Sequence, residues 1–194
     1  MANFKHCLSL KSVLIMKLTL IVLAFLLSVT TVQAQEWEVY KNETLEFRAA
    51  YPDTPDKTVQ KVSTALGELD MHMIMYAPSS GDDNAVYAVI RSDYPKSQFE
   101  GADSEMYTKV LDGAVEGARS NLKGTLIFDK TVTFNGFHGR NIKIEITGAY
   151  VYMNAILAYN TMFITQVICS TEKDNNTSIQ KFLNSFDIIK IRGY

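Results

Sequence analysis

Cysteine, histidine and proline are scarce in this chain, and each shortage narrows what the protein can be. The 194 residues include two cysteines, three histidines and four prolines. Two cysteines allow one disulfide at most, which excludes a small scaffold held together by several bridges. The histidines and cysteines also lack the spacing of a zinc site. We therefore predict a fold that rests on its apolar core, with no metal and no cofactor.

Clusters of basic residues are missing as well. The first 34 residues contain three lysines and no acid, so the remainder has 16 basic and 21 acidic residues and a formal charge of −5. Phosphate backbones and anionic lipid surfaces attract clustered Lys and Arg. We therefore expect no nucleic-acid partner and no binding to an anionic membrane. Neither a P-loop nor a dinucleotide-binding glycine motif is present.

The N-terminus has the three parts of a secretory signal peptide. Lys17 supplies the positive charge, Leu18–Val29 is a mostly apolar run, and Val32-Gln33-Ala34 is a suitable cleavage site ahead of Gln35. The apolar run is shorter than the roughly 20 residues that a membrane span needs. A retained anchor helix is the alternative interpretation. Since no cysteine follows the run, we predict no lipid anchor.

These features give the predicted domain organisation. Residues 1–34 are a signal peptide, residues 35–194 are one domain, and Met16 is a better start for the precursor than Met1. The product is expected to be exported to the periplasm or the outside. Cleavage removes Cys7 and leaves Cys169 in an apolar run typical of a buried strand, where a cysteine acts as a small hydrophobe.

Alternating apolar residues and short apolar runs predict a protein rich in strands. The expected strands are 37–40, 45–50, 59–64, 68–76, 85–91, 125–134, 140–146, 151–159, 162–170 and 186–191. Asn135-Gly136 predicts a tight turn, and we expect a second one at Asn160-Thr161. The prolines at 52 and 55 predict a break after the second strand.

Two helices are expected beside these strands. The first covers Ser104–Asn121, with Asp103 or Ser104 as its N-cap and Gly124 as its terminator. Gly113 and Gly117 weaken this helix, and we interpret them as a close approach to a sheet. The second covers roughly residues 175–184. The fold class is therefore α+β, an antiparallel sheet of about six to seven strands flanked by two main helices in α/β/α layers.

Several short motifs occur in an order that resembles the PsbP-like superfamily. They are Phe47-x-Ala49-x-Tyr51-Pro52, Gly67, Tyr87-x-Val89 leading to Tyr94-Pro95, and the ending Lys181-Phe182-Leu183-Asn184-Ser185-Phe186. The superfamily includes an extrinsic photosystem II subunit, a Ran-binding nuclear import factor and many exported bacterial proteins of unknown role. The resemblance implies an antiparallel sheet with helices on both sides and no enzymatic activity. The chain looks closest to the exported bacterial members.

Two sets of residues are candidates for ligand binding. Met71, Met73 and Met75 share one face of a strand, and methionines can line an adaptable groove. An irregular core beneath a helix is the other interpretation of this face. Tyr150 and Tyr152 share the strand face opposite Met153, and such aromatics suit an interface or an ordinarily covered sheet.

Residues with catalytic chemistry are isolated in the sequence, so we name no catalytic residue. His72 and His138 have no nucleophile and acid at a recognisable spacing. Asp82-Asp83-Asn84 has fewer oxygen ligands than a calcium loop, and a solvated loop is the simpler interpretation.

We predict an exported, non-enzymatic binding or assembly module of the bacterial cell envelope, whose partner is a protein or an envelope component. Two alternatives stay open. One is a carrier of a small apolar ligand, with the methionine face as its pocket. The other is an envelope hydrolase using carboxylates such as Glu145 and Asp70.

Overall fold

The computed structural model describes residues 36–64 and 67–189. The predicted signal peptide, its cleavage site before Gln35, the proposed start at Met16 and Cys7 lie outside these residues. The described part forms one compact unit that begins at Glu36. No helix among the described residues is long and apolar enough to cross a membrane.

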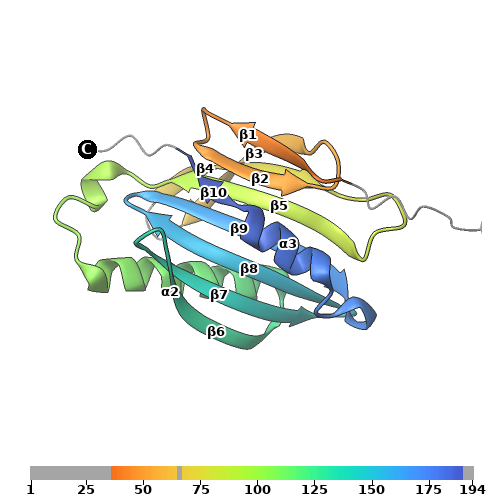
Figure 1. The fold of residues 1–194 in the computed structure, drawn as a ribbon. Helices are drawn as coiled ribbons and strands as arrows, with labels where there is room; N and C mark the ends of the chain where they lie inside the picture. Colours follow the sequence, from red (N-terminus) through yellow and green to blue (C-terminus); the bar gives the residue numbers. More distant parts are fainter. Residues whose placement is uncertain (1–35, 65–66, 190–194) are drawn as a thin grey trace, which may run out of the picture. The chain divides into compact units, whose positions relative to one another are not determined.

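Seven antiparallel strands form the main sheet, in the spatial order β3-β4-β5-β9-β8-β7-β6 (Figure 1). The strands are β3 (Asp56–Thr64), β4 (Gly67–Tyr76), β5 (Asn84–Asp93), β6 (Thr125–Phe134), β7 (Phe137–Ile146), β8 (Ala149–Ala158) and β9 (Thr161–Ser170). Tight hairpins join β6 through β9, because each pair closes over two residues. The predicted turn at 135–136 is confirmed. The turn predicted at 160–161 lies one residue earlier, at Tyr159-Asn160.

A second, three-stranded sheet has the order β1-β2-β10. Its strands are β1 (Glu38–Asn42), β2 (Phe47–Tyr51) and β10 (Asp187–Ile188), so the first and last strands of the described residues belong to the same sheet. The prediction found β1 and β2 and the break after them. The last strand, predicted at 186–191, starts one residue later than predicted, after the buried Phe186, and the end of the predicted range at 190–191 lies outside the described residues.

The two helices lie on opposite faces of the main sheet. Helix α2 (Ser104–Leu122) packs on β7 and β8, while α3 (Thr177–Ser185) contacts β9 and the small sheet (Figure 1). Two single turns, η1 (Lys96–Gln98) and η2 (Thr171–Lys173), complete the structure. The predicted α+β class, with an antiparallel sheet between helices, is confirmed.

The largest core cluster lies between the main sheet and the layer made by α3 and the small sheet. The PsbP-like motifs meet in it, from both ends of the chain: Phe47, Ala49, Tyr51, Tyr87, Val89, Phe182, Leu183 and Phe186. Each is at most 5% exposed. Truncating one of the buried aromatic residues to Ala is expected to lower the free energy of unfolding by about 3–5 kcal/mol. The motifs therefore mark packing, which is why their order carries the resemblance. Cys169 is buried among them, as predicted.

Glycines near α2 have roles that differ from the prediction. A Cβ at Gly113 or Gly117 would meet nothing within 4 Å, so neither supports a close approach to the sheet. The left-handed residue that ends α2 is Lys123, with φ 51°. Gly124, which follows, is needed for space: a Cβ there would lie 2.8 Å from the Glu145 carbonyl oxygen and even nearer to Ile144. The close approach is real, but it occurs after the helix.

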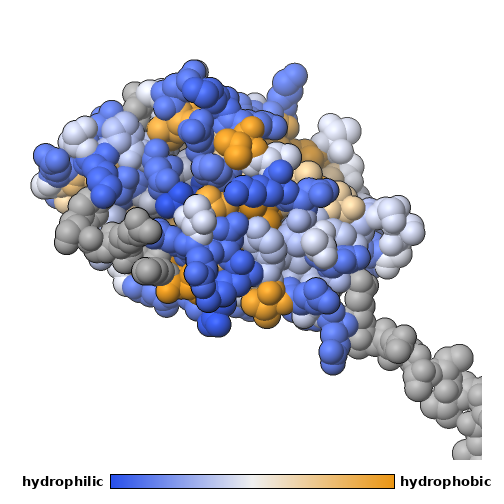
Figure 2. All heavy atoms as spheres, turned by 90° about the horizontal axis from the view of Figure 1, so that it is seen from above, coloured by the Kyte–Doolittle hydropathy of each residue, from blue (hydrophilic) through white to orange (hydrophobic). Residues whose placement is uncertain are grey.

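The face that is uppermost in Figure 1 is shown in Figure 2. Apolar residues appear on it as separate patches between hydrophilic ones. Val39 and Val59, 66% and 51% exposed, are the most exposed large apolar residues of the described chain. Scattered exposed apolar residues are normal on a monomer's surface. This face therefore gives no evidence of an apolar docking surface.

Candidate functional site

The predicted candidate residues lie on opposite faces of the main sheet. Met71, Met73 and Met75 are half-buried on β4, on the face opposite the buried Ile74. They belong to none of the three core clusters of the described residues, and α2 packs on the distant β7 and β8. The methionines thus lie outside the core that α2 covers on β7 and β8. A role for this methionine face in ligand binding stays a prediction.

Tyr150 and Tyr152 lie on β8, three strands from β4 in the sheet order, and on the opposite face from Met153, as predicted. They enclose the ammonium group of Lys143, whose Nζ is 3.9 Å and 4.9 Å from the two ring centroids. Nζ also lies 2.8 Å from both carboxylate oxygens of Asp174, and the Tyr152 hydroxyl donates to the same carboxylate at 2.5 Å. The two tyrosines thus flank a partly buried ion pair.

Burial, hydrogen bonds and neighbouring charges together set the ionisation in this network. Burial alone would lower the pKa of Lys143, but hydrogen bonds to Asp174 and Tyr152 outweigh it and raise that pKa. Burial would raise the pKa of Asp174, yet hydrogen bonds from the same two partners hold it below its ordinary value. Burial and the bond to Asp174 raise the pKa of Tyr152. Lysine and aspartate therefore stay charged at neutral pH, as a structural pair does.

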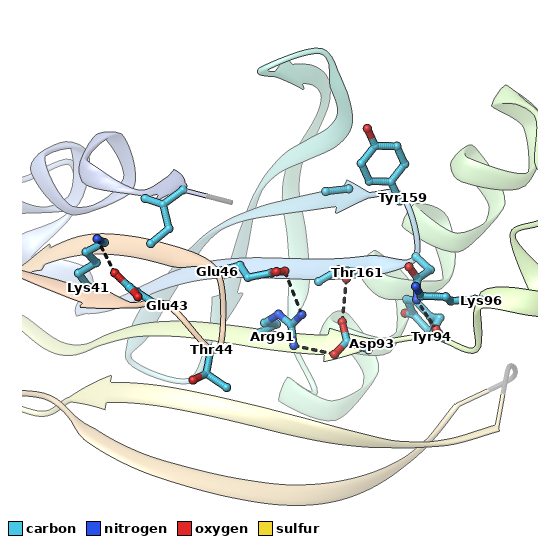
Figure 3. Close-up of a pocket in the computed structure, with 13 residues that line it drawn as sticks. Lys41, Glu43, Thr44, Glu46, Arg91, Asp93, Tyr94, Lys96, Tyr159 and Thr161 are labelled. Carbon is cyan, nitrogen blue, oxygen red and sulfur yellow. Dashed lines mark hydrogen bonds and ion pairs between the residues drawn. The ribbon is translucent and has the colours of Figure 1, made fainter. Parts of the chain in front are cut away.

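The candidate functional site is a groove of about 870 Å³ at the C-terminal end of β5, near Asp93, and the N-terminal end of β9, near Thr161. It is lined by residues of three stretches, 41–46, 91–96 and 158–161, together with Ile189, and we call it the hairpin groove (Figure 3). The first stretch is the β1–β2 hairpin, the second is the end of β5, and the third is the β8–β9 turn. Its volume lies within the range of about 300–1,000 Å³ that is typical of ligand pockets.

Arg91 links the two sheets at the floor of the hairpin groove. Its guanidinium lies 3.5 Å from the Glu46 carboxylate, on the hairpin, and 2.6 Å from the Asp93 carboxylate (Figure 3). The Arg91 side chain is only 11% exposed, and its buried Nε has no hydrogen-bond partner. Thr161 donates to the second oxygen of Asp93 at 2.7 Å. These contacts fix the polar groups of the floor before any ligand arrives.

Charge is balanced over the hairpin groove. The cations that line it are Lys41, Arg91 and Lys96, and the anions are Glu43, Glu46 and Asp93. Lys41 and Glu43 pair at 2.8 Å, and Arg91 is shared by the other two anions. The site therefore presents both donors and acceptors without a net charge.

Backbone strain also concentrates at the hairpin groove. Five non-glycine residues of the described chain have positive φ: Glu46, Lys123, Asn135, Tyr159 and Asn175. Asparagine tolerates this conformation, and Lys123 occupies the ordinary left-handed position after a helix. The remaining two, Glu46 at 59° and Tyr159 at 53°, both line the groove. Strain of this kind is typical of functional sites.

The turn that contains Tyr159 can be compared with another two-residue turn in the same sheet. The β6–β7 hairpin also closes over two residues, and it uses Asn135-Gly136, which suits positive φ. The β8–β9 hairpin instead places a tyrosine at its first position, where the ring is 38% exposed. The ring packs edge-on against Phe137, with centroids 5.4 Å apart. An exposed aromatic residue is thus held at a position where asparagine or glycine would have less backbone strain.

The other residues considered from the sequence do not assemble. Glu145 on β7 and Asp70 on β4 are separated by three strands, so these carboxylates do not meet. His138 is exposed and stacks on Tyr107. His72 on β4 lies opposite Arg91 on β5 in the strand register.

The acidic loop that contains Asp82 and Asp83 is used internally. Asp82 accepts from the Tyr87 hydroxyl at 2.6 Å, and Asp83 pairs with Lys173. No group of metal-ligating side chains occurs among residues 36–64 and 67–189.

Comparisons with known proteins identify the type of fold. A scan against protein-family models finds no match, and a search of the curated proteins finds none. Among solved structures, cyanobacterial PsbP (CyanoP) from Synechocystis sp. PCC 6803 matches with a TM-score of 0.52 and 11% identity, over 83% of this chain and 97% of that chain. The chain has a PsbP-like fold. PA94 from Pseudomonas aeruginosa, a protein of unknown function, also matches, with a TM-score of 0.37 and 11% identity over 71% of this chain and 85% of that one.

Within the PsbP-like fold, most of the recognised motif residues lie away from the hairpin groove. Tyr94 is the exception, since it lines the groove and its carbonyl accepts from Asn160 at 2.6 Å. Sequence reasoning missed the groove because its three stretches are far apart in the chain. The signal that was present is the tight turn between two strongly predicted strands, which was expected at Asn160-Thr161 without a glycine and which the structure places at Tyr159-Asn160.

Proposed function

We propose that this protein is a non-enzymatic binding module of the bacterial cell envelope, and that it binds its partner in the hairpin groove. One observation carries the proposal: Glu46 and Tyr159, the two positive-φ residues that ordinary turn chemistry does not explain, both line this groove. A left-handed L-residue costs roughly 1–2 kcal/mol. A sequence that keeps two such costs at one site is expected to use that site.

The fixed polar floor supports binding more than reaction. Arg91 is shared by Glu46 and Asp93, and Asp93 is held further by Thr161, so these groups are oriented in advance. Preorganised groups lower the cost of binding, because less side-chain freedom is lost when the ligand arrives. The groove thus has the character of a receptor site.

The envelope location rests on the N-terminal sequence. Lys17, the apolar run and the Val32-Gln33-Ala34 site have the order of a cleavable signal. Cells expressing the full chain are therefore expected to release a product that begins at Gln35, with a formal charge of −5. N-terminal sequencing and intact mass of the exported protein measure this. An N-terminus upstream of residue 30 on the exported protein would show that the leader is retained.

Retention on the native envelope tests the binding site. Purified protein is incubated with the envelope fraction of its source organism, and the bound share is measured after sedimentation. Asp93→Asn keeps the shape of the floor but removes one charge, and we expect it to lower retention clearly. Lys173→Ala, which alters a surface pair at the opposite end of β5, is the matched control and should bind like the unmodified chain. Equal retention of all three proteins would show that the partner does not bind in the hairpin groove.

A further inference from the structure

We infer that the ligand of the hairpin groove is an uncharged saccharide chain. This inference rests on the proposed function, since it names the class of ligand for the same groove. It follows from three properties of the lining: its balanced charge, its mixture of donors and acceptors, and its exposed aromatic ring.

Balanced charge disfavours an ionic ligand. A carboxylate or phosphate would compete with Glu46 and Asp93 for the Arg91 guanidinium, which already contacts both. A cationic group would have to compete with Arg91 for the same carboxylates. Either exchange breaks one partly buried pair to form another, so little free energy is gained. A neutral ligand leaves the floor intact and uses its remaining hydrogen-bonding capacity.

Hydroxyl groups match that capacity. A carboxylate oxygen has more than one lone pair, so Asp93 can accept from a ligand while it holds Arg91 and Thr161. The groove also contains the ammonium of Lys96 and the amide of Asn160, which donate. A sugar hydroxyl both donates and accepts, and neighbouring hydroxyls on one ring can satisfy an acid and a donor together. A purely apolar ligand would displace water from the Asp93 carboxylate, which is 46% exposed, without replacing its hydrogen bonds.

Tyr159 supplies the apolar part of the site. A sugar ring has one face of C–H groups, which packs on an aromatic ring, and a rim of hydroxyls. In Figure 3 the Tyr159 ring stands at the border of the groove, away from the Arg91 and Asp93 pair. Its contact with Phe137 and its place in a two-residue turn keep it in position. An exposed ring on one side and fixed polar groups on the other suit a ligand with both kinds of surface.

A peptide partner fits the groove less well. Extended peptides usually gain affinity by adding a strand to an open sheet edge. The floor strands β5 and β9 each have a hydrogen-bonded neighbour on both sides, so neither offers an open edge. The edge strands beside the groove are β1 and β10 of the small sheet, and strand addition there is the outcome that the protease treatment tests.

The test separates a saccharide from a protein on the same envelope fraction. One portion is treated with periodate, which cleaves vicinal diols, and another with a protease that is then inhibited. We expect periodate to abolish retention and protease treatment to leave it. On an array of bacterial envelope saccharides, the purified protein should bind neutral glycans. Tyr159→Asn should weaken that binding roughly tenfold, as the loss of one aromatic contact implies. Tyr159→Phe, which keeps the ring, should bind normally.

The contrary outcomes are distinct. If protease abolishes retention, periodate does not, and Asp93→Asn still lowers it, the ligand is a protein and the saccharide inference is wrong while the proposed function stands. If the array shows no glycan whose binding depends on Tyr159, the inference is also wrong. If retention depends on neither Asp93 nor Tyr159, the proposed function fails with it. Asparagine tolerates positive φ, so Tyr159→Asn is expected to fold, and circular dichroism checks this.

Discussion

At the scale of single residues, Tyr159 connects stability with function. Its φ of 53° is unfavourable for a tyrosine and acceptable for an asparagine. We expect Tyr159→Asn to raise the free energy of unfolding by up to about 1 kcal/mol, because relief of strain exceeds the loss of the edge-on contact with Phe137. Urea denaturation measures the change. A loss of stability greater than about 1 kcal/mol would show that the tyrosine is kept for packing.

Lys143 and Asp174 form a partly buried ion pair whose loss should lower stability. The Lys143 side chain is 9% exposed and that of Asp174 is 27% exposed. Asp174→Asn leaves a buried ammonium with a weaker partner, and we expect a loss of about 2 kcal/mol, less than for a fully buried pair. Asp83→Asn, which alters the exposed pair with Lys173, should change stability by less than about 0.5 kcal/mol in the same denaturation experiment.

The same pair makes stability depend on pH with a definite sign. Because the pKa of Asp174 is lowered by folding, its contribution is present at neutral pH and is lost as pH falls through that lowered pKa. Because the pKa of Lys143 is raised, its contribution persists until pH rises through that raised value. Between pH 7 and pH 3 the unmodified protein should therefore lose more stability than Asp174→Asn. Parallel acid profiles for the two proteins would show that the carboxylate is not coupled to folding.

At the scale of elements, the glycines around α2 give opposite predictions for the same substitution. Gly113→Ala and Gly117→Ala should each raise the free energy of unfolding by about 1 kcal/mol, since both sites are open and helical. Gly124→Ala should lower it by about 1–3 kcal/mol, because the new Cβ collides with the β7 backbone at Glu145. Thermal or urea unfolding of the three variants decides the matter. Destabilisation by Gly117→Ala would restore the idea of a close helix–sheet approach.

The elements that sequence predicted well are those with a strong local pattern. Ile142 and Ile144 alternate on β7 and are buried on α2's side of the sheet, as a period of two requires. Helix α2 begins at Ser104 because the Asp103 side chain accepts from the Met106 amide. Local signals of this kind need no knowledge of the rest of the chain.

Features that depend on distant segments were not predictable in this way. Nothing in the sequence pairs Glu46 with Arg91, because the contact depends on how the small sheet packs on the main one. The candidate set of Met71, Met73 and Met75 with Tyr150 and Tyr152 was divided by the sheet for the same reason. Alternation shows which residues share a face of one strand, but not which strands become neighbours.

At the scale of the whole molecule, the PsbP-like core and the candidate binding site lie in different parts of the structure. Motif residues such as Phe47 and Phe182 meet in the core between the two sheets and α3. The hairpin groove lies where the β1–β2 hairpin reaches the ends of β5 and β9. A chain can therefore keep this fold while its loops set the ligand. The methionine face of β4 is the competing surface, because a carrier of apolar ligands would use it.

Hydrogen–deuterium exchange of the protein, free and bound to its native envelope fraction, is the most direct test of the hairpin groove. We expect added protection in residues 41–46, 91–96 and 158–161, with no change in β4 or around Lys143 and Asp174. Asp93→Asn should reduce that protection, while Lys173→Ala should leave it as in the unmodified chain. Protection confined to β4 and its methionines, or spread over neither surface, would contradict the account.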